Sequence, residues 1–76
     1  MKEILETMIK NLVEDEASVS IEEITQDSEI KFEVRVNEKD MGRVIGKKGK
    51  IAQSIRIVMK AIAAKENKKT SIEFID

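Results

Sequence analysis

The 76-residue sequence contains no cysteine, no histidine, no proline, no tryptophan and no tyrosine. Without cysteine the chain has neither a disulfide nor a thiolate metal site. Without histidine it lacks the commonest metal ligand and general base, and therefore also the Ser–His and Cys–His nucleophile pairs. Carboxylates are plentiful, but no pattern groups them with a nucleophile or a metal site. We therefore expect no enzymatic activity, no catalytic residues, no metal and no cofactor.

Long hydrophobic runs are also missing. No apolar segment approaches the roughly 18 residues of a membrane span, and the N-terminus does not have the pattern of a signal peptide. We expect a cytoplasmic protein without membrane insertion. The length is that of one small domain covering residues 1–76, and small domains without disulfides often gain stability by forming oligomers.

Positive residues are few in the first half of the chain and negative residues are few in the second half, and the net charge of −1 conceals this difference. Residues 1–40 carry five Lys/Arg and twelve Asp/Glu, a net charge of −7, whereas residues 41–76 carry nine Lys/Arg and three Asp/Glu, a net charge of +6. Such asymmetry suggests a nucleic acid or another anionic partner for the second half. A basic surface that is merely solvated would have the same composition.

The spacing of apolar residues predicts six elements in the order α-β-β-α-α-β. Pairs of apolar residues repeat every four positions over residues 2–14, which indicates an amphipathic helix. Alternation with a period of two predicts strands over 19–24 and 30–36, joined by a turn at 26–28. Asn37 is the expected N-cap of a short helix over 38–45. A longer helix is expected over 50–65 and a last strand over 71–75. We expect an α+β domain in which three helices pack on one face of a three-stranded sheet.

All three glycines of the chain fall in one nine-residue segment, residues 42–50, which reads GRVIGKKGK. A sharp turn between two helices needs one glycine at most. The additional glycines are explained if a nucleic-acid backbone comes close to the main chain at Gly46 and Gly49. Free amides at the start of the long helix would then face the phosphates, and Lys47 and Lys48 would add positive charge.

Other phosphate-binding patterns do not fit this segment. The P-loop pattern fails because Val44 stands at the first glycine position and Ile51 replaces the hydroxyl residue that binds magnesium. The dinucleotide pattern G-x-G-x-x-G fails because Val44 also occupies its second glycine position. The spacing G-x-x-G between two helices is that of the KH domain, whose loop clamps about four nucleotides of single-stranded RNA.

The segment DMGRVIGKKGKIA, residues 40–52, resembles the signature of the KhpA family of small bacterial single-KH RNA-binding proteins. The resemblance extends over essentially the whole chain and implies a type II KH domain. It further implies an RNA chaperone or post-transcriptional regulator, present as a homodimer or paired with a larger KH protein linked to cell-envelope growth and cell shape. The expected RNA-binding residues are Gly42, Arg43, Val44, Ile45, Gly46, Lys47, Lys48, Gly49, Lys50 and Ile51.

Aromatic residues are scarce as well, and both fall on the apolar side of their strands. We expect Phe32 and Phe74 in the core, which disfavours binding modes that stack bases on exposed aromatics. An aliphatic groove is expected instead, with one wall near the second strand at 34–36. The other wall would be formed by Val44, Ile45 and Ile51, with Ile55 mostly in the core. Arg35 or Arg43 could contact the edges of bases.

A second surface is expected on the outer face of the long helix. Ile57, Ala61 and Ala64 lie within about 60° of one another, opposite the core stripe. An exposed isoleucine beside two alanines suits close packing of two helices about a two-fold axis. We expect a homodimer, or pairing with a related KH protein, through this face.

Two other functions remain open from the sequence alone. Residues 38–45 and 50–65 could form a helix-turn-helix that binds duplex DNA, although the outer face of the second helix offers few polar residues to read bases. The chain could also be an assembly module in which the glycine loop is only a turn.

Overall fold

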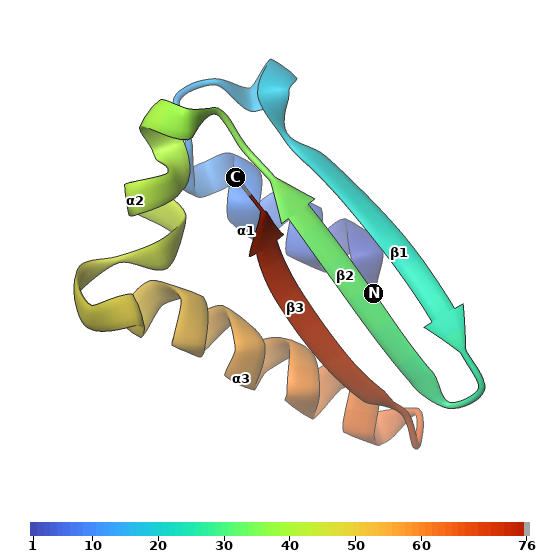
Figure 1. Cartoon of the computed structure of the whole chain (residues 1–76). Coiled ribbons are helices and arrows are strands. Elements are labelled where there is room, and N and C mark those ends of the chain that lie inside the picture. Colours follow the sequence, from blue (N-terminus) through green and yellow to red (C-terminus); the bar gives the residue numbers. More distant parts are fainter. Residues whose placement is uncertain (76) are drawn as a thin grey trace.

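The computed structural model describes residues 1–75 and has the six predicted elements in the predicted order (Figure 1). They are α1 (Lys2–Leu12), β1 (Ser20–Gln26), β2 (Glu29–Arg35), α2 (Met41–Ile45), α3 (Lys50–Lys65) and β3 (Lys69–Ile75). Short 3-10 turns, η1 (Glu16–Ser18), η2 (Glu38–Asp40) and η3 (Lys47–Gly49), precede β1, α2 and α3. The start of the predicted short helix is therefore the separate turn η2. The predicted strands and the long helix lie within two residues of their observed bounds.

The three strands form one mixed sheet in the order β1-β2-β3. β1 and β2 are an antiparallel hairpin, whose tight turn includes Asp27 in a left-handed conformation with φ of 56°. β2 and β3 run parallel, so Phe32 stands beside Ile72 in the register. The connection between them passes through α2 and α3, as a parallel pair requires. β3 is consequently an edge strand.

All three helices lie on one face of the sheet, as predicted (Figure 1). Alternate residues of β2 enter the core because side chains of a strand point to opposite faces. Phe32 is fully buried, which confirms its expected place in the core, and Phe74 is only partly buried. The buried apolar cluster comprises Leu5, Ile9, Ile21, Ile30, Phe32, Val34, Val44, Ile55, Met59 and Ile72.

The longest helix, α3, spans the 16 residues predicted for it and begins directly after Gly49, whose φ is 73°. It ends in a turn where Asn67 has φ of 57° and the Lys68 amide donates to the Ala63 carbonyl at 2.9 Å. This left-handed residue and its hydrogen bond release the chain into β3. Within residues 1–75, no helix combines the length and the apolar character needed to cross a membrane.

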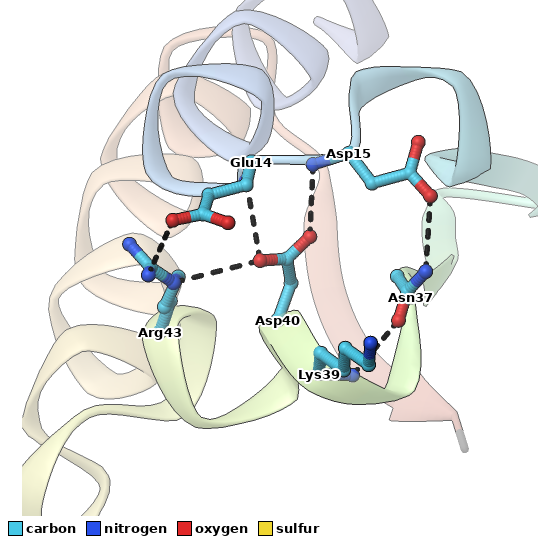
Figure 2. A network of polar contacts seen from close by, with 6 residues as sticks. All are labelled: Glu14, Asp15, Asn37, Lys39, Asp40 and Arg43. Atoms are coloured by element: carbon cyan, nitrogen blue, oxygen red, sulfur yellow. Dashed lines mark hydrogen bonds and ion pairs between the residues drawn. The ribbon is translucent and has the colours of Figure 1, made fainter.

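A buried carboxylate ties the start of α2 to the loop after α1 (Figure 2). Asp40 is only 3% exposed, and its two carboxylate oxygens accept hydrogen bonds from the amides of Glu14 (3.1 Å) and Asp15 (3.0 Å). Arg43 Nε lies 3.5 Å from the same carboxylate and compensates its charge. Because α2 leads into the glycine loop, this network also fixes where the loop stands relative to α1.

A second set of hydrogen bonds extends the network to η2. Asp15 accepts from Ser18 Oγ and from Asn37 Nδ2, and both bonds lower the pKa of the Asp15 carboxyl. Its contribution to stability is therefore present at neutral pH and is lost as the pH falls through the lowered pKa. Asn37 Oδ1 accepts from the Lys39 amide at 2.9 Å, which confirms Asn37 as the cap of this turn.

We expect replacement of Asp40 by alanine to lower the free energy of unfolding by about 3 kcal/mol. The change removes two charge-assisted hydrogen bonds and leaves the amides of the α1–β1 loop without their acceptor. Glu38→Ala is the control, because Glu38 is exposed in the same turn, and it should change stability by less than about 0.5 kcal/mol. Urea denaturation followed by circular dichroism measures both. An Asp40→Ala protein as stable as wild type would contradict this role.

Candidate nucleic-acid interface

The glycine loop connects α2 to α3 at one end of the molecule, beyond the edge of the sheet (Figure 1). The amide of Gly46 donates to the Gly42 carbonyl at 2.9 Å and ends α2. The chain then turns through Gly46 (φ 76°), Lys48 (φ 56°) and Gly49 (φ 73°). Three residues with positive φ within four positions reverse the chain between the two helices.

The two loop glycines are needed for different reasons. A Cβ on Gly46 would lie 2.6 Å from Cγ1 of Ile51, so Gly46 allows α3 to pack against the turn. A Cβ on Gly49 would meet nothing within 4 Å. The prediction that both glycines open the main chain to a ligand is therefore wrong for Gly46, whose missing side chain makes room for Ile51. Of these two loop glycines, Gly49 is the one that leaves open space beside the backbone.

The backbone amides at the start of α3 are also less available than predicted. Gly49 donates its N–H to the Gly46 carbonyl at 3.1 Å, and Lys50 donates its N–H to the Lys47 carbonyl. Both hydrogen bonds are internal to the turn η3, which thus satisfies these two donors itself. These two amides therefore do not point freely at a ligand, and the loop offers mainly the charge of its side chains.

Three lysines supply that charge. Lys47, Lys48 and Lys50 are exposed, and among residues 1–75 the structure pairs none of them with a carboxylate. Lys48 has a left-handed backbone, a conformation that costs a non-glycine residue of order 1 kcal/mol or more. The loop is a concentrated positive charge next to the open space at Gly49.

Arg43, predicted to bind RNA, is engaged elsewhere. Its Nη2 lies 2.8 Å from Glu14 Oε1 and its Nε lies 3.5 Å from Asp40 Oδ1 (Figure 2). The acidic segment after α1 thus neutralises one of the four cations of the glycine segment. Arg43 holds α2 against this segment, and its positive charge is partly compensated there.

The aliphatic groove expected near the loop is not present in that form. Val44 and Val34 are fully buried and pack in the core, so they cannot line a groove. Ile45 and Ile51 are partly buried against the same core, and Ile55, at 3% exposure, is a core residue as predicted. The apolar residues of β2 alternate onto the face of the sheet that the helices cover, so they lie in the core and away from any open surface.

Hollow surface lies on both sides of α3. Ile51 and Ile55 line an apolar hollow of about 360 Å³ between α1 and α3. Further hollows lie between α3 and the free edge of β3. Two adjoining hollows of about 350 and 650 Å³ share Lys60, Thr70 and Ser71. The hollow nearer the glycine loop includes Gln53, Arg56, Ile57 and Ile72. The farther hollow is lined by Glu29, Ile30, Ala61, Ala64, Lys68 and Lys69 besides the shared residues. We call the two together the α3–β3 groove.

The strand wall of this groove presents backbone groups. The Lys69 amide bonds to the Ser28 carbonyl, so alternate residues from Lys69 onward face β2. The residues between them, Thr70, Ile72 and Phe74, direct their N–H and C=O groups to the free edge. The hydroxyl oxygen of Thr70 is buried, and no residue in the part described here is its hydrogen-bond partner.

Sequence reasoning missed Arg56, Lys60, Lys68 and Lys69 as groove residues. The helix period does place Gln53, Ile57, Lys60 and Ala64 on one side of α3, but it cannot say that the edge of β3 lies opposite. The side chains of Ile57, Ala61 and Ala64 are exposed as predicted, and Ile57 is 61% exposed. These three residues therefore line the groove as well as the expected dimer face.

Residues 2–74 match the sequence model of the family described as KhpA/KhpB, KH domain. The chain is similar to the RNA-binding protein KhpA of Clostridium acetobutylicum, with 48% identity over 99% of this chain and 100% of the relative. It is 47% identical to the protein of that name from Clostridium perfringens over the same shares, and 37% identical to that of Listeria monocytogenes over 100% of both chains.

Two solved structures share the fold. One is Era Y63A of Aquifex aeolicus bound to GDP.AlF4-, with a TM-score of 0.65 and 20% identity. The other is Era in complex with MgGDPNP and nucleotides 1506–1542 of 16S ribosomal RNA, with a TM-score of 0.59 and 22% identity. In both cases 95% of this chain is covered, and it spans only 28% of the solved chain.

We expect alanine at each of the three glycine positions to change the free energy of unfolding by a different amount. Gly46→Ala should cost about 3 kcal/mol, because a left-handed backbone and a clash with Ile51 add up. Gly49→Ala should cost about 1 kcal/mol, because only the backbone conformation opposes it. Gly42→Ala is the control, and should raise stability by about 0.5–1 kcal/mol, because Gly42 is helical with open space around it. Thermal denaturation ranks them, and equal losses for Gly46→Ala and Gly49→Ala would contradict the Ile51 contact.

Proposed function

The chain belongs to the KhpA/KhpB KH-domain family, and we propose that it binds single-stranded RNA by holding the RNA backbone at its GKKG loop. A KH domain is a binding module, and the chain is not an enzyme. In this module a G-x-x-G loop between two helices clamps about four nucleotides of a single strand. Here that loop is Gly46–Gly49.

One observation carries the proposal. Lys47, Lys48 and Lys50 form an exposed cluster without carboxylate partners in the described part of the chain, next to the open space at Gly49. Such a cluster attracts phosphates, and no ion pair within the described residues competes for its charges. The absence of a Cβ at Gly49 lets a phosphodiester backbone approach the turn.

The α3–β3 groove is the path that we propose for the bases. It begins near the loop and follows α3 from Gln53 to Ala64. From Lys50 to Ala64 the helix extends about 20 Å, a length that suits a clamp of about four nucleotides. Lys60, Lys68 and Lys69 add positive charge at the far hollow. Backbone groups on the free edge of β3 supply polar partners for base edges.

The cellular role that we propose is that of an RNA chaperone or post-transcriptional regulator in the cytoplasm. It rests on membership of the family and on the resemblance of the glycine segment. Pairing with a larger KH protein connected to cell shape belongs to the same proposal. A helix-turn-helix contact with duplex DNA is less well supported, because the outer side of α3 faces a groove beside β3 and α2 has only five residues.

We expect Lys47→Asp/Lys48→Asp to weaken binding of a uridine octamer by about tenfold or more, because two cations next to the phosphates become anions. For wild type, the logarithm of the affinity should fall with the logarithm of the salt concentration by about 0.7 for each phosphate neutralised. The slope of the variant should be shallower by about 1.4, since two contacts are lost. Fluorescence anisotropy at several salt concentrations measures both quantities.

A double variant with the same change in charge, Lys2→Asp/Lys39→Asp, is the control, because both lysines lie in the acidic half and away from the groove. It should keep most of the affinity. Equal binding by the loop variant and wild type would remove the loop from the mechanism. Competition by duplex DNA as effective as that by single-stranded RNA would favour the helix-turn-helix function.

We also propose that two copies pair through Ile57, Ala61 and Ala64. Ile57, at 61%, has the largest exposed fraction among the exposed large apolar residues, and the alanines beside it let another helix approach closely. In such a dimer the two GKKG loops could hold one RNA backbone and raise its apparent affinity, whereas the part of the groove lined by these residues would be covered.

Ile57→Asp should abolish this pairing, because a carboxylate would be buried at the contact. In sedimentation equilibrium wild type should have twice the chain mass of 8.6 kDa, and the variant should have the mass of one chain. Val58→Asp is the control, since Val58 is also exposed, at 43%, but faces the hollow between α1 and α3. Wild type sedimenting as one chain would contradict the proposal.

A further inference from the structure

Arg56 reaches from α3 across the α3–β3 groove to strand β3. Its Nε donates to the Ile72 carbonyl at 3.3 Å, and its guanidinium carbon lies 5.4 Å from the centre of the Phe74 ring. It also lines the hollow nearer the glycine loop. Two contacts thus hold the guanidinium inside the groove, whereas the lysines of the loop project from the surface.

This hydrogen bond changes what the strand edge offers to a base. At Ile72 the free edge would otherwise present one acceptor and one donor, its C=O and its N–H. Arg56 donates to this C=O and adds further donors beside the N–H, so that donors predominate at this point of the surface. A guanidinium has five N–H donors and no acceptor. Only one of the five has an acceptor within residues 1–75, and no ion pair with a carboxylate of these residues engages the others.

The four bases differ in how well they match a surface made of donors. Guanine presents two neighbouring acceptors, O6 and N7, and cytosine presents O2 and N3. On every edge of adenine that carries the amino group, a donor stands next to the ring acceptor. In uracil the N3–H donor separates the two carbonyls. A planar fork of donors therefore pairs twice with guanine or cytosine and at most once with adenine or uracil.

We propose that Arg56 makes the groove select a base with two neighbouring acceptors, guanine or cytosine, at the position beside Ile72. This inference rests on the proposed RNA-binding function and adds a base preference to it. Arg56 acts here by direct contact with the base. Because Ile72 and Phe74 already hold the side chain in place, binding costs less conformational entropy than it would for a free arginine.

The test compares three RNA octamers with alternating sequence, (UC)4, (UG)4 and (UA)4, in fluorescence anisotropy at one salt concentration. Wild type should bind (UC)4 or (UG)4 about tenfold more tightly than (UA)4, the discrimination expected of one bidentate pair. If (UG)4 is preferred, replacing guanine by 7-deazaguanine removes the N7 acceptor and should abolish the preference. If the preference for guanine is unchanged by this replacement, N7 is not contacted, and the proposed bidentate contact with O6 and N7 is overturned.

Two variants distinguish the base preference due to Arg56 from its general electrostatic contribution to RNA affinity. Arg56→Lys keeps the charge and loses the fork, and Arg56→Gln loses both, so each should bind the three octamers within about twofold of one another. Lys60→Gln is the matched control, because it removes one charge from the same wall of the groove. It should weaken all three octamers equally and keep the preference. Circular dichroism melting verifies that each variant folds.

Discrimination that persists in Arg56→Lys would overturn the inference, and so would a wild type that binds the three octamers equally. In that second case RNA binding itself stands, and only the base preference is lost. A wild type that binds none of the octamers overturns both the inference and the proposed function. The two failures are therefore distinguishable in one experiment.

Discussion

The contact between Gly46 and Ile51 is the constraint on which the site depends. Ile51 lies where a Cβ of residue 46 would be, so α3 can begin close to the end of α2 only if that position has no side chain. The reversal places Lys47 and Lys48 at the tip of the loop and opens the space beside Gly49. It also sets the direction of α3, and with it the wall of the groove. A packing requirement inside the protein thus shapes a surface for a ligand.

The uneven distribution of charge serves two purposes in the folded molecule. The acidic segment after α1 is joined to the start of α2 by its backbone amides, which donate to Asp40, and by the ion pair of Glu14 with Arg43. These contacts anchor the helix that carries the loop. Lys47, Lys48 and Lys50 remain exposed, and no ion pair with a carboxylate of residues 1–75 engages them. The net charge of −1 conceals this separation, and attraction of a polyanion depends on the local cluster more than on the total.

The α3–β3 groove and the proposed dimer face share the side chains of Ile57, Ala61 and Ala64. A second copy packed on this face and a strand of RNA in the groove would therefore contact the same residues. The two proposals make different demands on Arg56, since a base needs its donors and a helix contact does not. The base preference and the oligomeric state together distinguish how the face is used.

The element order, the core position of Phe32 and the bounds of α3 followed from the sequence, because apolar periodicity reports which side of each element is buried. The glycine and lysine pattern likewise indicated the loop and its family. Other features depend on distances between segments that are remote in sequence. The engagement of Arg43 by Glu14, the burial of Val44 and the contact of Arg56 with Ile72 all arise only when separate elements meet. Periodicity defines one face of a helix at a time, and only the packed fold decides what stands opposite that face.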